Sequence, residues 1–275
     1  VYRKQIKPMV DKGSVKTLMK MPILSGVVKK KIYNKLRDAF GGEFIEIIIG
    51  GAALNEEVES FFRKIGFEVT VGYGMTECGP LISYASCDKI KPQSVGITIN
   101  YLESKIHKPN RQTRIGEICV RGENVMEGYY KNDEATAATL DSDGWLHTGD
   151  LGLKDRDGFL FIKGRSKSMI LGPSGQNIYP EEIEAQLNYM PFVAESLVID
   201  KDRSLVALIY PDMDQVKEND ISESELGEKL EENRVILNKA LPGYSKISKV
   251  EIYPREFEKT PSRKIKRYLY TILTN

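Results

Sequence analysis

The fold is decided by residues 44–77, which read FIEIIIGGAALNEEVESFFRKIGFEVTVGYGMTE. The apolar run 44–49 predicts a buried strand, and it leads directly into a Gly-Gly pair. Asn55 and the two glutamates after it predict the start of a helix that ends at Gly66. A second apolar run, 67–71, predicts the next strand and enters another glycine loop. This order predicts part of a parallel sheet, with ligands at the carboxyl ends of its strands.

The flanking regions predict two further kinds of structure. Before this stretch, apolar residues recur at helical spacing over 26–40, and a Gly-Gly pair ends the pattern. After it, residues 91–164 alternate short strand-like runs with turns, including those at 141–144 and 155–158. We therefore expect residues 1–90 to be part of an α/β subdomain, followed by a small antiparallel β subdomain.

Residues 165–275 predict a third, α+β domain of ordinary size. Pro180, which two glutamates follow, is predicted to occupy the first position of a helix. The runs 193–199 and 204–210 predict two strands around a charged turn. A capping box that begins at Ser222 predicts a long helix after them. The predicted fold class is therefore α/β plus α+β.

Composition bounds the function classes. The chain has 275 residues, 41% of them hydrophobic and 29% charged, and a net charge of +1, which is typical of a globular protein and argues against a nucleic-acid partner. The cysteines, Cys78, Cys87 and Cys119, fit neither a zinc pattern nor a disulfide framework, and they predict a reducing, cytoplasmic location. No signal peptide or membrane-spanning run is visible, and the start at Val1 suggests a piece of a longer protein.

The charge is concentrated near the beginning of the sequence. Residues 1–40 carry eleven Lys or Arg but only Asp11 and Asp38 as acids. This pattern favours a solvated basic helix face, and the alternative is peripheral contact with an anionic membrane surface at the inner face of the membrane.

The strongest chemical motif is GYGMTE at residues 72–77. Its glycines let the backbone approach a ligand closely. Thr76 can donate to a phosphate oxygen, Glu77 offers an oxygen ligand for Mg²⁺, and Tyr73 presents a flat ring to a purine. The alternative is an ordinary strand-to-helix turn with a surface carboxylate.

Four more motifs are ambiguous when each is taken alone. Asp150 in WLHTGD can accept hydrogen bonds from ribose hydroxyls or simply cap a turn, and His147 beside it has no evident partner for a nucleophilic triad. The segment GRSKSMI from residue 164 falls at the predicted domain boundary. The segment 174–184 reads as a loop followed by a capped helix, and the segment 260–267 reads as a basic cluster.

Taken together, these five motifs in this order resemble the adenylate-forming superfamily of acyl-CoA synthetases, luciferases and peptide-synthetase adenylation domains. The resemblance covers residues from about 40 to 267, and the opening region is most similar to long-chain fatty acyl-CoA ligases. It implies a ligase that activates a fatty acid with ATP and Mg²⁺ to acyl-AMP and then transfers the acyl group to CoA. It also implies that residues 165–275 form a mobile C-terminal lid.

The resemblance further implies a set of nucleotide-binding residues. Tyr73 would pack on adenine, Thr76 would bind the α-phosphate, Glu77 would hold Mg²⁺, and Asp150 and Arg165 would bind the ribose. The full nucleotide set is Gly51, Ala52, Ala53, Gly72, Tyr73, Gly74, Met75, Thr76, Asp150, Ile162, Arg165 and Lys264.

The remaining implied roles concern the lid. Lys264 would be a catalytic residue alongside Thr76 and Glu77, placing positive charge on the substrate carboxylate and the developing phosphorane. Lys167 would be the hinge of the lid. The CoA tunnel would be lined by Ser174, Gly175 and Gln176.

The sequence departs from the family pattern in two places. Arg263 stands where the family usually has Gly before the lysine, and the phosphate loop of the type TSGTTGxPKG is absent from the 275 residues. We therefore expect this chain alone not to adenylate a fatty acid, an expectation that ATP–pyrophosphate exchange by it would contradict. Two alternatives stay open: a peptide-synthetase-type adenylation domain and a non-catalytic nucleotide-binding module. A Rossmann dehydrogenase is disfavoured, because this sequence has no GxGxxG motif.

Overall fold

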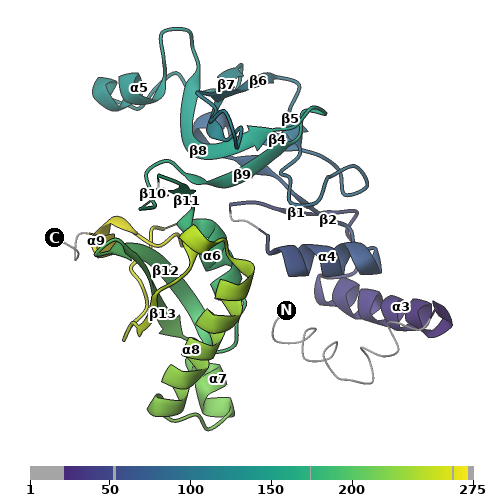
Figure 1. The fold of residues 1–275 in the computed structure, drawn as a ribbon. Helices are drawn as coiled ribbons and strands as arrows, with labels where there is room; N and C mark the ends of the chain where they lie inside the picture. The colour runs from purple at the N-terminus through teal and green to yellow at the C-terminus, as the bar shows by residue number, and fades with distance from the viewer. Residues whose placement is uncertain (1–21, 52–53, 174, 262, 272–275) are drawn as a thin grey trace. The chain divides into compact units, whose positions relative to one another are not determined.

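The computed structural model describes residues 22–51, 54–173, 175–261 and 263–271 (Figure 1). The chain divides into two compact units: the first runs to Thr148 and includes 152–162, and the second comprises 149–151 and the chain from Lys163 onward. The architecture is mixed α/β with several separate sheets, as the predicted fold class requires. The separation of residues 1–90 from 91–164 stays a prediction.

The first unit begins with the predicted helix–strand–helix–strand pattern. Helix α4 starts after Asn55, whose side chain accepts from the backbone N–H groups of Glu57 and Val58, and it ends at left-handed Gly66. Strands β1 and β2 pair in parallel, which confirms the predicted parallel arrangement. The elements here are α3 (Pro22–Ala39), β1 (Ile47–Ile49), α4 (Glu56–Ile65) and β2 (Val69–Val71).

One expectation about this region was wrong. The run 44–49 does not form a buried strand over its whole length, because β1 is only three residues long and Ile45 and Ile48 are 94% and 56% exposed. Strands β1 and β2 form a sheet of two strands, and α4 buries one side of the region through Val58 and its apolar neighbours. Ile48 thus stays more than half exposed, so hydrophobicity alone overestimated burial here.

The rest of the first unit is β-rich, as predicted for residues after 91. A sheet of order β3-β4-β5 precedes a second sheet of order β6-β7-β8-β9, and backbone hydrogen bonds close the predicted turns at 141–144 and 155–158. A short helix, α5, was not predicted. The elements are β3 (Tyr73–Gly74), the 3-10 turn η2 (Thr76–Cys78), β4 (Leu81–Tyr84), β5 (Ile97–Thr98), β6 (Leu102–His107), β7 (Gly116–Gly122), α5 (Asp133–Thr139), β8 (Leu146–Lys154) and β9 (Leu160–Arg165).

The second unit contains the helices and strands predicted after residue 165. Pro180 occupies the start of α6, the charged turn joins β12 to β13, and the Ser222–Glu225 capping box opens α8, so these predictions are confirmed. The elements are β10 (Ile170–Leu171), β11 (Asn177–Ile178), α6 (Pro180–Leu187), β12 (Val193–Lys201), β13 (Ser204–Pro211), α7 (Met213–Glu218), α8 (Glu223–Ala240), η3 (Gly243–Ser245), β14 (Lys249–Ile252) and α9 (Tyr268–Thr271).

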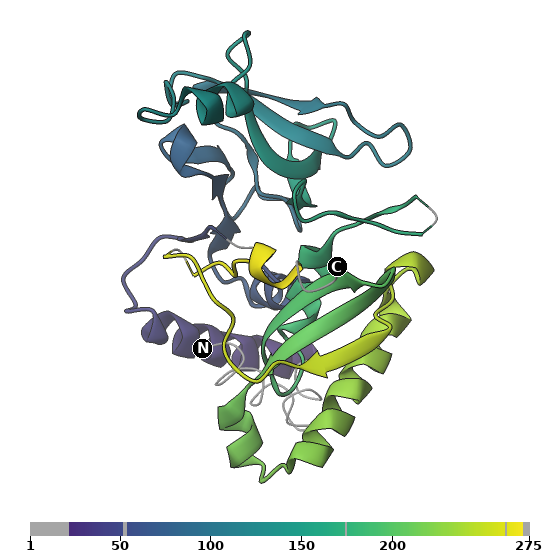
Figure 2. The same cartoon turned by 90° about the vertical axis from the view of Figure 1, so that its left-hand side faces the viewer.

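The sheet β12-β13-β14 of this unit is covered on both faces. Alternation along β12 sends Val198 into a core shared with α6 and α8, and it sends Leu197 and Ile199 into a second core with Phe257 and Tyr270. Figures 1 and 2 show α8 running alongside this sheet. The C-terminal segment that follows β14 is therefore packed on the sheet, and this packing positions the lysine motif.

Among the described residues, no helix combines the length and the apolar character that crossing a bilayer would require. Most of the basic run 1–40 lies outside the described residues, which begin at Pro22, so its contact with a membrane stays a prediction.

Candidate functional site

The GYGMTE motif forms a tight turn between β3 and β4. A side chain at Gly74 would place its Cβ 1.9 Å from the carbonyl oxygen of Pro80, so only glycine fits there, whereas Gly72 has ordinary space around it. The backbone N–H of Met75 donates to that same Pro80 oxygen at 2.8 Å, which fixes the turn. The turn leaves Thr76 exposed and Glu77 half-buried.

The carboxylate of Glu77 is held by a tyrosine from a distant segment. The Tyr129 hydroxyl donates to Glu77 Oε1 at 2.8 Å, and this hydrogen bond raises the pKa of Tyr129. The backbone of the turn is braced from the same segment, because Met126 N–H donates to the Glu77 carbonyl and the Asn124 amide donates to Cys78 and Leu81 carbonyls. Sequence reasoning missed Tyr129.

Three of the predicted nucleotide residues lie in one hydrophobic cluster of the first unit. Tyr73 is buried in this core at 7% exposure, and Met75 and Ile162 pack against it half-buried. This burial leaves little of Tyr73 accessible to an adenine ring. Gly51 is exposed with φ of 81°, while Ala52 and Ala53 lie outside the described residues.

The two predicted ribose ligands meet in the second unit. Asp150 on β8 is 9% exposed, and its Oδ1 lies 3.3 Å from Nη1 of Arg165 at the end of β9. The backbone N–H of Ser166 donates to the Gly149 carbonyl at 2.8 Å, which holds the two segments together. The arrangement presents a carboxylate and a guanidinium, side by side, to a ligand with hydroxyl groups.

The predicted hinge and CoA-loop residues lie in two turns that follow β9. Lys167 is exposed in a turn closed by hydrogen bonds from the N–H groups of Ser168 and Met169 to the Arg165 carbonyl. Gly175 and Gln176 are exposed at the tip of the β10–β11 hairpin, and Gly175 has φ of 81°. Ser174 lies outside the described residues.

Lys264 is exposed on a short loop near the C-terminus. The backbone N–H of Thr260 donates to the Lys264 carbonyl at 2.8 Å, and the Lys264 N–H donates to the Thr260 hydroxyl at 3.1 Å. Within the described part of the chain, the Lys264 ammonium makes no ion pair, whereas that of Lys266 lies 3.7 Å from Glu258. Arg263 has φ of 60°, so it adopts the left-handed conformation that glycine would adopt more easily.

A buried ion pair anchors the segment that carries Lys264. Arg267 donates to both carboxylate oxygens of Glu184 on α6, at 2.8 and 2.6 Å, and to the Val198 carbonyl at 2.9 Å. Burial raises the pKa of Glu184, and the Arg267 guanidinium opposes that shift. Sequence reasoning treated the basic run around Arg267 only as a motif, and it missed this anchoring role.

His147, for which the sequence shows no evident partner in a nucleophilic triad, has two polar neighbours in the structure. Its Nδ1 lies 2.8 Å from Glu117 Oε2 and 3.5 Å from Cys119 Sγ, both on the neighbouring strand β7. Cys119 is fully buried, and burial raises its pKa to about 12, so a thiolate nucleophile is disfavoured here.

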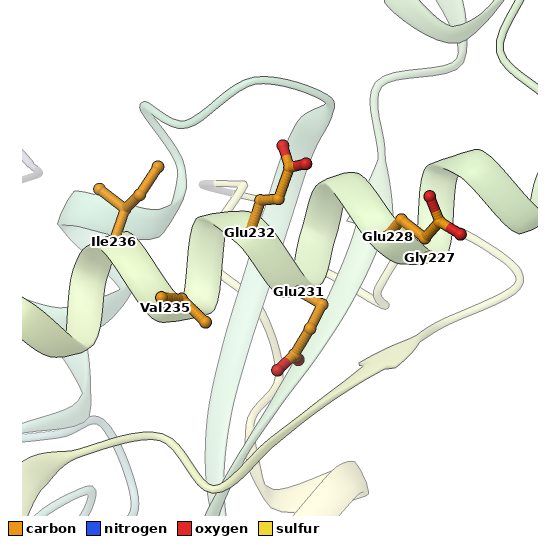
Figure 3. Close-up of a pocket in the computed structure, with 6 residues that line it drawn as sticks. All are labelled: Gly227, Glu228, Glu231, Glu232, Val235 and Ile236. Atoms are coloured by element: carbon orange, nitrogen blue, oxygen red, sulfur yellow. The ribbon is translucent and has the colours of Figure 1, made fainter.

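One pocket lies along α8 in the second unit (Figure 3). Two of the carboxylates that line it, Glu231 and Glu232, already pair with Arg234 and Lys229. None of the residues predicted to bind nucleotide or CoA lines it, so we do not assign it to the chemistry.

Comparison with known proteins agrees with the motif order. Residues 9–130 match the family model described as AMP-binding enzyme, and residues 167–271 match that of the AMP-binding enzyme C-terminal domain. The chain is 35% identical over 176 residues to a long-chain-fatty-acid–CoA ligase, FadD15, of Mycobacterium bovis, covering 63% of the chain and 28% of the relative. It is 32% identical over 260 residues to 4-coumarate-CoA ligase 1 of Narcissus pseudonarcissus, covering 90% of the chain and 46% of the relative.

Solved structures give the same result. The chain superposes with a TM-score of 0.68 on O-succinylbenzoate coenzyme A synthetase of Bacillus subtilis in complex with AMP, at 29% identity, covering 87% of the chain and 49% of the synthetase. A complex of the same synthetase with its acyl-adenylate intermediate gives a TM-score of 0.67. The chain thus spans about half, or less, of the length of the proteins it matches.

Proposed function

The chain belongs to the AMP-binding enzyme family, and from this premise we propose that it forms part of an ATP-dependent, AMP-forming acyl-CoA synthetase. The full-length protein would activate a carboxylic acid to acyl-AMP, with release of pyrophosphate, and then form a thioester with CoA. The observation that carries this proposal is the GYGMTE turn, in which an unavoidable glycine presents exposed Thr76 next to a fixed Glu77 carboxylate.

The chemistry of this turn fits a magnesium nucleotide. The Tyr129 hydroxyl donates a hydrogen bond to Glu77 Oε1. Among the described residues, Glu77 Oε2 accepts no hydrogen bond, so this oxygen can bind a hard cation. Protein sites bind Mg²⁺ through one or two carboxylates and the phosphates of the substrate. Mg²⁺ held by Glu77 would neutralise phosphate charge, and the Thr76 hydroxyl would donate to the α-phosphate.

The second unit would supply the ribose ligands and the mobile charge. Asp150 can accept hydrogen bonds from ribose hydroxyls, with Arg165 3.3 Å away fixing the carboxylate. Lys264, exposed and without an ion pair among the described residues, can place its ammonium on the substrate carboxylate while charge builds up at the α-phosphate. Lys167 would serve as the hinge, and Gly175 and Gln176 would line the path of CoA.

We propose long-chain fatty acids as the substrates. The support is the similarity to a long-chain-fatty-acid–CoA ligase and the basic opening region. A hydroxycinnamate-type aryl acid is the second candidate, because the similarity to 4-coumarate-CoA ligase 1 extends over 90% of the chain.

A substrate panel tests both the activity and its acyl specificity. The full-length protein is incubated with ATP, Mg²⁺, CoA and either palmitate, a short fatty acid or 4-coumarate, and AMP release is measured. We expect AMP release that needs both the acid and Mg²⁺ and that is fastest with palmitate. Preference for 4-coumarate would replace the fatty-acid proposal, whereas nucleotide binding without AMP release from any acid would favour a non-catalytic module.

A further inference from the structure

The two histidines and one of the three cysteines gather on one face of the sheet β6-β7-β8-β9. Glu117 and Cys119 are two residues apart on β7, so they share a face, and His147 joins them from the adjacent strand β8. Each offers one donor atom, and the three atoms lie within 4.8 Å of one another. The acyl-CoA synthetase chemistry described above uses none of these side chains.

From this geometry we infer that Glu117, Cys119 and His147 form a binding site for a borderline divalent cation such as Zn²⁺. A thiolate sulfur, an imidazole nitrogen and a carboxylate oxygen are the donor types that Zn²⁺ accepts. On binding, the cation would replace the thiol proton of Cys119, which is released to solvent.

Two of the three distances between donor atoms can be compared with those around a tetrahedral ion. With ordinary metal–ligand bond lengths, tetrahedral coordination requires about 3.5 Å between sulfur and nitrogen and about 3.3 Å between nitrogen and oxygen. The structure has 3.5 Å from Cys119 Sγ to His147 Nδ1 and 2.8 Å from that nitrogen to Glu117 Oε2. The nitrogen–oxygen distance would therefore have to lengthen by about half an ångström, and the sulfur–oxygen distance is at most 4.8 Å.

A second carboxylate stands where a metal-binding histidine usually needs one. Asp141 Oδ2 lies 3.6 Å from His147 Nε2, the nitrogen on the far side of the ring from the proposed ion. Backbone N–H groups of Asp143 and Trp145 donate to the other oxygen of Asp141 and hold it in place. A small rotation of the imidazole would complete the hydrogen bond that orients metal-bound histidines.

The two cationic side chains near the proposed metal site contact the Trp145 ring. Lys105, opposite Cys119 in the β6–β7 register, and Arg121 both lie over the Trp145 ring, at 3.9 and 4.7 Å from its centroid. His107 lies edge-on to His147 and adds no donor atom to the group of three. Cys119 is buried while Glu117 and His147 are half-buried, so the ion would enter from their side and keep one position for water.

Co²⁺ titration tests the site, because a thiolate bound to Co²⁺ gives a charge-transfer absorption band. The full-length protein, freed of metal with a chelator, should develop this band at one equivalent of Co²⁺, and Zn²⁺ should abolish it. Cys119→Ser should lose the band, whereas Cys87→Ser, the matched control with a half-buried thiol elsewhere, should retain it.

Competition with a chromophoric chelator then measures Zn²⁺ affinity in variants whose circular dichroism matches the wild type. We expect His147→Gln to weaken binding at least about tenfold and Asp141→Asn about 10–100-fold. Absence of the band in the folded wild type would overturn the inference in favour of a hydrogen-bonded cluster. A band of equal strength in Cys119→Ser would also overturn it, by locating the metal at other thiols.

Discussion

Replacing Arg267 by Met should destabilise the second unit far more than loss of a surface charge would. The substitution removes three hydrogen bonds, two to Glu184 and one to the Val198 carbonyl, and leaves the Glu184 carboxylate buried at 8% exposure. Removing one partner of a buried ion pair costs about 3–5 kcal/mol, because the other charge stays in a poorly solvated site. For a unit of this size, that corresponds to a fall in melting temperature on the order of 10–20 °C.

The loss should depend on pH with a definite sign. Burial already raises the pKa of Glu184 against the opposing effect of Arg267, and the substitution removes that opposition. A carboxyl whose pKa is higher in the folded state binds more protons there than in the unfolded state. The stabilisation that this carboxyl gives to the folded state is therefore fully present at a pH below its pKa in the unfolded state. It is lost as the pH rises through its pKa in the folded state. We expect Arg267→Met to be less destabilising at pH 5 than at pH 7.5.

Urea denaturation of the 275-residue chain measures this effect unit by unit. The single tryptophan, Trp145, lies in the first unit, so its fluorescence reports that unit while far-ultraviolet circular dichroism reports both. The expected result is an early circular-dichroism transition with an unchanged fluorescence transition. Lys229→Met, which breaks an exposed pair with Glu232, is the control and should cost less than about 1 kcal/mol.

A double variant decides whether the buried charge is the cause. Glu184→Leu combined with Arg267→Met removes both charges, and buried pairs replaced in this way are often neutral or stabilising. Recovery of most of the lost stability would support the reasoning. A single variant that costs no more than the Lys229→Met control, or a cost independent of pH, would refute it.

Three further predictions concern the proposed chemistry. Tyr129→Phe removes a hydrogen bond from the proposed metal ligand and should raise the Mg²⁺ concentration for half-maximal AMP release about tenfold, while Tyr130→Phe should not. Lys264→Ala should slow ATP–pyrophosphate exchange about 100–1000-fold, and Lys266→Ala should slow it by less than tenfold, as rate assays of the full-length protein can show. Arg263→Gly should raise the free energy of unfolding by about 1 kcal/mol, because it relieves a left-handed backbone conformation.

The sequence predicted well those features that depend on residues close together in the chain. The Asn55 cap, the Gly66 end of α4 and the Ser222 capping box all rest on contacts within a few positions. The partners of the functional side chains could not be found in this way. Tyr129 lies 52 residues from Glu77, and Arg267 lies 83 residues from Glu184, so only the folded chain pairs them.

At two places the residue type alone did not predict the burial or the backbone conformation, and each has a physical reason. The apolar run that contains Ile48 predicted a buried strand, but burial depends on what packs against each face of the strand, and Ile48 is 56% exposed. Arg263 departs from the family's glycine, yet its φ is positive. The hydrogen bonds between Thr260 and Lys264 close the loop, so they determine the backbone there and the side chain tolerates it.

A hinge at Lys167 requires that the backbone rotate without opening either hydrophobic core, and the described cores meet that condition. The clusters around Val198 and Phe257 draw only on residues after 162, whereas the cluster around Tyr73 draws only on residues up to 162. Each of these hydrophobic clusters can therefore keep its packing while the turn at Lys167 changes conformation. Substitutions at Lys167 should then alter the rates of the two half-reactions and leave both urea transitions unchanged, whereas Arg267→Met should lower activity together with the stability of the second unit.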